Sequence, residues 1–287
     1  MEIKGIFETK KVDSTLCNLR LEKEYSQSDT SDFNIPTFVI NLDRSRERFL
    51  KIKNLLDEIS VPFERISAVD GKSLSNEEFF EHYSKELNAK NYFIPLRDGE
   101  IGCYLSHIKI WKEIVARNLD YALILEDDAN PYPLIKYLPK ILENIEDMWD
   151  FIKLANPGKK KRINSEKTIN IGDKRKFKIV TWNKPPITTL AQVVTKNAAT
   201  KLLKIREKFG RPVDVDLQHV WEHELKIIGI LPELVHTDAN AESTIIRRET
   251  KLTPKVARLK YKAKYSFNLF CYSSLKRGFH MKESHHV

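Results

Sequence analysis

The sequence predicts an α/β fold in which helices flank a mostly parallel sheet, and three observations support this prediction. Short apolar runs rich in β-branched residues alternate with stretches whose apolar residues recur at helical spacing. One of the runs, YALILE, is uninterrupted, which is typical of a strand covered on both faces. The 287 residues are 41% hydrophobic and 31% charged, as in packed proteins and unlike fibrous or disordered chains.

The main domain is predicted over residues 35–249, after a polar, turn-rich lead-in over residues 1–34. Its first strand is IPTFVINLD, and the helical spacing of apolar residues in RSRERFLKIKNLLDEIS predicts the helix that follows, capped by Asp43 or Ser45. The segment VPFERISAVDG then predicts a second strand that ends in an Asp-Gly turn. Together these segments form a strand, helix, strand unit of the parallel type.

Later elements follow the same alternation. A helix over GCYLSHIKIWKEIVARN leads into the strand YALILE, and WDFIKLA and KFKIVTW are further strand candidates. The polar and basic residues 156–175 are predicted to form a surface loop. The segment TTLAQVVT predicts another strand, and the helix after it is expected to stop near Gly210.

Cysteine content and hydropathy indicate the cellular compartment in which the protein is expected. Three widely spaced cysteines make a poor disulfide framework, and no CxxC pair offers a zinc site. No apolar run reaches the length of a membrane span, and the N-terminal residues lack the pattern of a signal peptide. These features predict a cytoplasmic protein.

Residues 250–287 form a basic, aromatic-rich tail, which we expect to be a helical appendage. The chain has a net charge of +9, and residues 250–280 hold eight Lys or Arg and no acid. Such a tail suits an anionic membrane surface or a nucleic acid. A solvated terminal helix that packs by its apolar side is the alternative interpretation.

Three consecutive acids, Glu126, Asp127 and Asp128, follow the strand YALILE directly. In open α/β sheets, ligands bind beyond the carboxyl ends of the strands, so these acids are expected to face a ligand crevice. Carboxylates this close repel one another unless a cation lies among them, and oxygen ligands favour Mg²⁺, Mn²⁺ or Ca²⁺. A diphosphate would complete the coordination shell. Alternatively, Asp128 caps the next element.

Six motifs in a fixed order resemble those of glycosyltransferase family 25: INLDRSRERF, RISAVDG, GEIGCYLSHIKIW, ALILEDD, QVVTKNAATKLL and PVDVDL. The resemblance, from about Thr37 to about Ile246, implies a GT-A fold, a UDP-sugar donor, Mn²⁺ or Mg²⁺, and inversion at the sugar carbon. Galactose is the commonest donor sugar of this family. The implied acceptor is a lipid-linked lipooligosaccharide or lipopolysaccharide glycan. The tail would then hold the enzyme at the cytoplasmic face of the inner membrane.

The same resemblance suggests roles for the acids. The acidic motif of GT-A enzymes corresponds here to LEDD, which assigns Asp128 to the metal, Glu126 to the metal or the donor ribose, and Asp127 to a position near the metal. A bound ion would neutralise charge on the UDP leaving group. His236 lies where such enzymes often place a late metal ligand, although a buried, hydrogen-bonded histidine explains it as well.

An inverting transfer needs a base that takes the proton of the attacking hydroxyl group, and a carboxylate is the usual choice. The segment RPVDVDLQ supplies Asp214 and Asp216. If the segment is extended, their spacing places both on one side, and Asp214 is the preferred base. The alternative is a helix N-terminus that begins near Pro212.

Further donor-binding residues are predicted at the strand ends and on the long helix. At the first strand-to-helix junction, backbone donors and cations can receive phosphates or uracil. Asp70, in the Asp-Gly turn, is a candidate base or ribose contact, although the turn alone also explains an aspartate at this position. The resemblance places the start of the long helix beside the donor. The residues in question are Asn41, Arg44, Arg48, Asp70, Ser106 and His107.

Two other functions compete with this interpretation. The segment HVWEH, residues 219–223, matches the H-x-x-E-H signature of zinc proteases, but few acids follow it to supply the third ligand. The pI of 9.2 favours a nucleic-acid-binding protein. However, the positive charge lies in the tail and the predicted loop, whereas the acidic cluster would repel a phosphate backbone. We therefore expect no nucleic-acid partner.

Overall fold

A computed structural model describes residues 33–145, 149–156, 162–172, 175–237 and 255–283. Most of the predicted lead-in, and the end of the predicted main domain from residue 238, lie outside these ranges. All of the described residues belong to one compact unit, Phe33–Val287.

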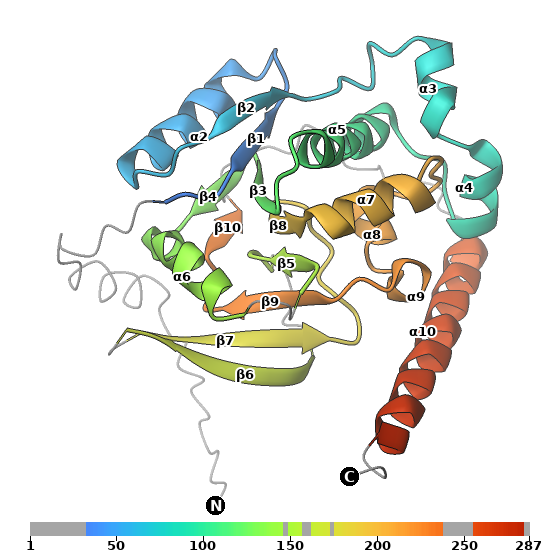
Figure 1. Cartoon of the computed structure of the whole chain (residues 1–287). Coiled ribbons are helices and arrows are strands. Elements are labelled where there is room, and N and C mark those ends of the chain that lie inside the picture. Colours follow the sequence, from blue (N-terminus) through green and yellow to red (C-terminus); the bar gives the residue numbers. More distant parts are fainter. Residues whose placement is uncertain (1–32, 146–148, 157–161, 173–174, 238–254, 284–287) are drawn as a thin grey trace, which may run out of the picture. The chain divides into compact units, whose positions relative to one another are not determined.

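A sheet of eight strands, in the order β2-β1-β3-β8-β5-β9-β7-β6, runs through the described part of this unit (Figure 1). The strands are β1 (Thr37–Asn41), β2 (Glu64–Ser67), β3 (Tyr121–Glu126), β5 (Phe151–Lys153), β6 (Ile163–Ile171), β7 (Arg175–Trp182), β8 (Ala191–Thr195) and β9 (Ile227–Leu231). Pairing is parallel for β1 with β2 and β3, and for β5 with β9. It is antiparallel for the other neighbours, so the sheet is mixed.

Helices cover both faces of this sheet, which confirms the predicted α/β fold. On one face, α2 (Arg46–Glu58) and α6 (Leu138–Glu143), with the 3-10 turn η1 (Pro133–Tyr137) before α6, pack against Leu123 and Leu125 of β3. On the other face, α5 (Asp98–Ala116) and α7 (Lys196–Ile205) pack against Ala122 and Ile124. Successive residues of a strand point to opposite faces, which explains why β3 is apolar up to its last residue, Glu126.

Short elements complete the described fold. Helices α3 (Asn76–His82) and α4 (Lys85–Asn91) lie between β2 and α5 in the chain, and α8 (Val213–Asp216) and α9 (Val220–His223) lie between α7 and β9. Strands β4 (Ala129–Pro131) and β10 (Val235–Thr237) form a separate antiparallel pair. Helix α2 follows Ser45 as predicted, but the Ser45 side chain makes no capping hydrogen bond.

The predicted surface loop over residues 156–175 is wrong in part, because Ile163–Ile171 forms β6 and pairs with β7 in a hairpin. The strand lies at the edge of the sheet, and its first six residues are exposed. Such a strand needs no apolar pattern along its outer half, so its sequence looks like that of a loop. Only Ile169 and Ile171 near its end are buried.

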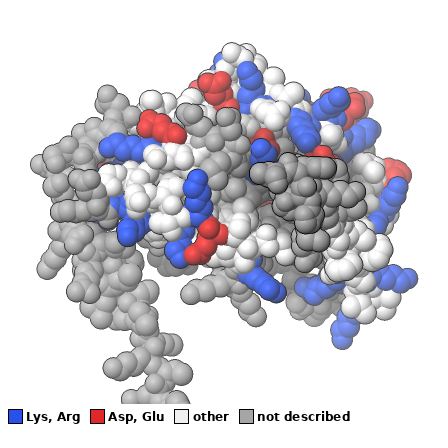
Figure 2. All heavy atoms as spheres, turned by 60° about the horizontal axis from the view of Figure 1, so that its bottom comes forward, with Lys and Arg blue, Asp and Glu red and all other residues white. Residues whose placement is uncertain are grey.

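The predicted basic appendage contains the helix α10 (Lys255–Glu283), which contacts α9. Tyr265 on α10 is buried, and its hydroxyl group donates a hydrogen bond of 3.0 Å to the carbonyl oxygen of Gln218. Among the described helices, none combines the length and hydropathy that crossing a bilayer requires. On the face shown in Figure 2, Lys and Arg side chains predominate over Asp and Glu, in keeping with the net charge of +9.

Candidate active site at the end of β3

Two cavities meet at the carboxyl end of β3. The first, of about 410 Å³, is bordered by the loops after β1, β2 and β3 and by α5. The second, of about 480 Å³, is bordered by α5, α8 and the segment before β8. Cys103 and Glu126 line both cavities. The β1 and β3 strands are parallel neighbours, so their following loops meet at one edge of the sheet, where ligands of such folds bind.

The first cavity gathers most of the predicted donor-binding residues, and with them the predicted metal ligand Asp128: Arg44, Arg48, Asp70, Ser106, His107, Glu126, Asp127 and Asp128. Lys72 and Arg97 line it as well. Arg97 Nη1 is buried and has no hydrogen-bond partner among the described residues. Leaving a buried charged donor unsatisfied is costly, so this group indicates a site for an anion. Arg97 directly precedes the helix α5, and no local sequence pattern distinguishes it from the other arginines of the chain.

Asp127 is held by neighbouring side chains. Asn41 Nδ2 donates to Asp127 Oδ2 over 2.8 Å, and Arg48 pairs with the other oxygen. Asn41 itself is buried, and its Oδ1 accepts from Arg65 Nε over 3.0 Å. Burial raises the pKa of Asp127, while Arg48 and Asn41 oppose that rise. Asn41 and Asp127 therefore tie the β1 and β3 ends together.

Asp128, in contrast, has a buried oxygen atom, Oδ1, without a hydrogen-bond partner among the described residues. Its other oxygen lies 3.4 Å from Arg48. Burial and then the nearby Glu126 raise the pKa of Asp128 to about 6. A half-buried, crowded carboxylate with an unsatisfied oxygen favours a bound cation, and carboxylate oxygens suit Mg²⁺ or Mn²⁺. Asp128 and Glu126 therefore fit a hard divalent ion.

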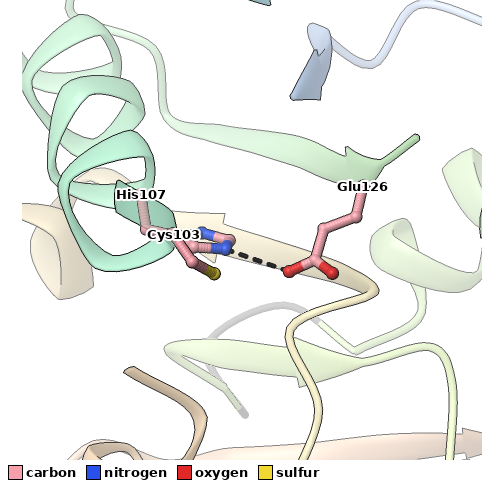
Figure 3. Close-up of side chains that lie close together, drawn as sticks. All are labelled: Cys103, His107 and Glu126. Atoms are coloured by element: carbon pink, nitrogen blue, oxygen red, sulfur yellow. Dashed lines mark hydrogen bonds and ion pairs between the residues drawn. The ribbon is translucent and has the colours of Figure 1, made fainter. Parts of the chain in front are cut away.

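A second set of potential metal ligands, Cys103, His107 and Glu126, has ligand atoms within 4.8 Å of one another. Figure 3 shows Cys103 and His107 one turn apart on α5, both directed towards Glu126 at the end of β3. Sulfur and nitrogen donors would favour a softer ion than Mg²⁺. However, burial and the neighbouring Glu126 raise the pKa of the Cys103 thiol, which disfavours the thiolate that a metal needs.

A chain of hydrogen bonds sets the tautomer of His107. Lys153 Nζ donates to the carbonyl oxygen of Thr188 over 2.6 Å and to Gln192 Oε1 over 3.3 Å. Because an ammonium group only donates, the amide nitrogen of Gln192 faces His107 Nδ1, at 3.2 Å. His107 Nδ1 is then an acceptor, and Nε2 carries the proton that it donates to Glu126 Oε1 over 3.4 Å.

This chain has consequences for Glu126 and for metal binding. Burial alone would raise the pKa of Glu126, but His107, Thr189 and Lys153 together outweigh it and the pKa is lowered, so Glu126 stays ionised. A protonated Nε2 has no lone pair for a metal, which makes His107 a positioning residue for Glu126. Lys153 is buried at the end of β5, and desolvation lowers its pKa to about 8. The sequence signal for Lys153 was a single lysine inside the apolar run WDFIKLA.

The second cavity contains Asp214, but the predicted extended geometry is wrong there. Residues Val213–Asp216 form the helix α8 with Pro212 as N-cap, so Asp214 and Asp216 do not share one side. Helix formation satisfies backbone groups that an extended segment would leave open, and Pro212 suits its start. Asp214 Oδ1 accepts from the Val215 backbone N–H over 2.7 Å, and burial raises the pKa of Asp214.

Asp216 lies in a buried ion-pair network and lines neither of these two cavities. It pairs with Arg206 at 2.6 Å and Arg211 at 2.8 Å, and the Tyr104 hydroxyl group donates to it over 2.6 Å. Burial favours a higher pKa for Asp216, but the two guanidinium groups and Tyr104 outweigh it and lower the pKa. This geometry suits a structural anchor for α8, whereas Asp214 suits a base.

Ser106 and Asp70 help to shape the first cavity. Ser106 Oγ donates to the carbonyl oxygen of Gly102 over 2.7 Å and accepts from the Val69 N–H over 2.8 Å. These bonds join α5 to the loop after β2, where Asp70 pairs with Arg44. Gly102 allows this approach, because a Cβ atom there would lie 2.7 Å from the backbone nitrogen of Gly71.

His236 and the HVWEH segment lie elsewhere. His236 on β10 stacks on Tyr132, with ring centroids 4.3 Å apart, and lines neither cavity. His223 uses both ring nitrogens, towards the Leu217 carbonyl oxygen and the Leu225 N–H, each at 3.0 Å. Glu222 binds Arg206 and Arg211. With those ligand atoms engaged, the segment forms no zinc-protease site.

Comparison with known proteins identifies one family. The profile of "Glycosyltransferase family 25 (LPS biosynthesis protein)" matches residues 34–217, which include all of the predicted site residues except His236. Human "Procollagen galactosyltransferase 2" is 29% identical over 62% of the chain, and Xenopus laevis "Procollagen galactosyltransferase 1-B" is 32% identical over 62%. Rat "Probable inactive glycosyltransferase 25 family member 3" is 30% identical over 69%.

The matched stretches cover 29% of the human and Xenopus proteins and 37% of the rat protein. The chain thus corresponds to well under half the length of these relatives. Because the name of the rat protein includes the words "Probable inactive", membership of the family does not by itself show activity, and the geometry of the site has to support it.

Proposed function

Because the chain belongs to glycosyltransferase family 25, we propose that it transfers galactose from UDP-galactose to a hydroxyl group of a lipid-linked lipooligosaccharide or lipopolysaccharide glycan. The transfer inverts the configuration at the sugar carbon and depends on Mn²⁺ or Mg²⁺. The donor occupies the first cavity and the acceptor the second, so that the reacting atoms meet beside Glu126.

One observation carries this proposal. A cationic nitrogen, Arg97 Nη1, and an anionic oxygen, Asp128 Oδ1, both buried and without partners among the described residues, border the same cavity. A diphosphate with its divalent ion would satisfy both, because the phosphate oxygens bind the guanidinium group and the ion binds the carboxylate. A nucleic-acid backbone without a divalent ion, or a neutral ligand, would satisfy at most one of them.

The protein groups have distinct tasks in the proposed reaction. Asp214 takes the proton of the acceptor hydroxyl group while its oxygen bonds to the sugar carbon. The bond from that carbon to the diphosphate breaks, and UDP leaves with the electron pair. Arg97 stabilises the charge on the leaving phosphates. Asp128 and Glu126 would hold the divalent ion, which neutralises leaving-group charge when bound.

Asp214 is suited to this task because burial raises its pKa above that of an ordinary aspartate. A base with a raised pKa binds the acceptor proton more strongly than a solvated aspartate does. Asp216 has the opposite property, since Arg211 and Arg206 hold its pKa low. The proposed base is therefore Asp214 alone.

The first test is isothermal titration of the protein with UDP, with and without Mn²⁺, for the wild type and for Asp128→Asn. We expect Mn²⁺ to strengthen UDP binding, and Asp128→Asn to remove most of that gain. Asp57→Asn is the matched control, because Asp57 is an exposed acid on α2, paired with Lys53 and remote from both cavities. It should bind like the wild type. UDP binding that is absent with Mn²⁺, or equal in Asp128→Asn, would contradict the proposal.

A further inference from the structure

Helix α10 carries an apolar stripe on its exposed side, made of Val256, Leu259, Phe267 and Phe270. Each of these side chains is 65 to 68% exposed. At 3.6 residues per turn, the four residues fall within an arc of about 80°. Exposed single apolar residues are common, but four on one stripe of a helix mark a surface that binds a partner.

The opposite side of α10 is attached to the rest of the protein. Tyr265 is buried and stacks edge-on against Trp221 at 5.0 Å between ring centroids. Tyr261 contacts Tyr92 and Phe93, with centroids 5.5 and 5.4 Å apart. The helix is thus anchored through one side, and the stripe is left facing solvent.

Lysines flank the stripe. Lys255, Lys260 and Lys262 are exposed, and helical geometry places Lys260 on one side of the stripe and the other two on the opposite side. Residues 251–282 contain no Asp or Glu. An apolar stripe with a cationic border is the pattern of a helix that lies in the plane of an anionic membrane surface.

We propose that α10 binds an anionic lipid bilayer, with the stripe at the boundary of headgroups and acyl chains and the flanking lysines among the phosphates. Lipid is the occupant that satisfies both features. A second copy of α10 would bring two cationic borders together, and a nucleic acid would leave the two phenylalanines and the aliphatic residues in water.

The contact of Tyr261 with Tyr92 extends the inference to the acceptor and rests on the proposed function. Tyr92 lines the second cavity and also contacts α10. Ile187, which is exposed, lines that cavity too. Binding through α10 would therefore bring the acceptor cavity close to the bilayer that presents a lipid-linked glycan.

Vesicle flotation with the full chain tests the membrane site. Vesicles of phosphatidylcholine alone are compared with vesicles that also contain phosphatidylglycerol. We expect binding to the anionic vesicles, weakened by salt, and a loss of about tenfold or more in Phe267→Ser with Phe270→Ser, because two large apolar side chains no longer enter the interface. Phe80→Ser, at another exposed phenylalanine, is the matched control and should bind like the wild type.

Three outcomes would overturn the membrane site: no flotation of the wild type, equal flotation of the double serine variant, or a dimer in solution that the double variant abolishes. UDP titration of the same variants separates this proposal from the proposed function. Normal UDP binding with lost flotation supports both. Flotation without UDP binding in any variant supports the membrane site and contradicts the transferase.

Discussion

Asp128 is a residue whose burial costs stability when no ion is bound. Its folded-state pKa of about 6 exceeds the ordinary value of 3.8, so the folded state holds the proton more tightly than the unfolded state. Ionisation above about pH 6 therefore works against folding, and this penalty disappears as the pH falls towards 3.8. Such a cost is common where a site is built for a ligand.

We therefore expect Asp128→Asn to stabilise the metal-free protein by about 1–2 kcal/mol above pH 6, with the difference shrinking at lower pH. Thermal unfolding in a chelator across this pH range measures it. Addition of Mn²⁺ with UDP should reverse the order, because the ligand stabilises only the wild type strongly. A variant that is less stable than the wild type at pH 8 in chelator would contradict the assignment.

Residues that follow strand ends were predictable, whereas residues that act through tertiary contacts were not. Glu126, Asp127 and Asp128 stand at the end of an apolar run, and parallel pairing brings Asn41 and Arg48 to the same edge. The roles of Arg97, Lys153 and Gln192 depend instead on which side chains meet across α5, β5 and β8. No local pattern in one sequence contains that information.

At the scale of elements, the contact of α5 with the loop after β2 positions one wall of the first cavity. Gly102 lies where the helix backbone comes close to this loop, and Ser106 binds the same loop one turn later. Helix propensity alone favours alanine over glycine by about 1 kcal/mol. The backbone of the loop opposes this preference, because a Cβ atom at Gly102 would overlap it.

We predict that Gly102→Ala destabilises the protein by about 1–3 kcal/mol and weakens UDP binding, because the loop with Asp70 must move. Urea denaturation and titration with UDP measure the two effects. Lys112→Ala, on an exposed position of the same helix, is the control and should change neither. If Gly102→Ala is stabilising, as propensity predicts, the loop does not pack as described.

Two elements, β6 and α8, could not be predicted from the spacing of apolar residues in the sequence. The outer strand β6 has exposed polar residues along most of its length, so periodicity could not distinguish it from a loop. Helix α8 is a single turn, and its two aspartates have the same spacing that a strand would give them. The spacing of apolar residues distinguishes a helix, a strand and a loop only when a segment is long enough to show a repeat. The elements β3, α2 and α5 are long enough, whereas α8 is not.

At the scale of the whole molecule, the sequence also did not predict the antiparallel strand pairs of the sheet, such as β3 with β8 and β8 with β5. Strand-helix alternation predicts parallel neighbours, but the order β3-β8-β5-β9 is set by which strands meet in the core. That order places the segment before β8 and helix α8 around the second cavity. The second cavity, which we propose binds the acceptor, therefore depends on the strand order of the fold and not on any local sequence pattern.

Cys103 and Glu126 line both cavities and so form a wall that the cavities share. This shared wall has a consequence for the choice between water and acceptor as the nucleophile. A volume of about 480 Å³ has room for many water molecules, each of which occupies about 30 Å³ in the liquid. In the proposed reaction, when the donor is bound and the acceptor is absent, water in the second cavity would adjoin Glu126 and compete as the nucleophile. We expect slow hydrolysis of UDP-galactose by the protein alone, measured as free galactose.

An acceptor analogue that lacks the reacting hydroxyl group should suppress this hydrolysis by filling the second cavity, and Asp214→Asn should slow it as well. Unchanged hydrolysis in the presence of a bound analogue would contradict the proposal that the acceptor occupies the second cavity. In the proposed reaction, the acceptor then has a second role besides receiving the sugar, because it excludes water from the second cavity and so prevents hydrolysis of the donor.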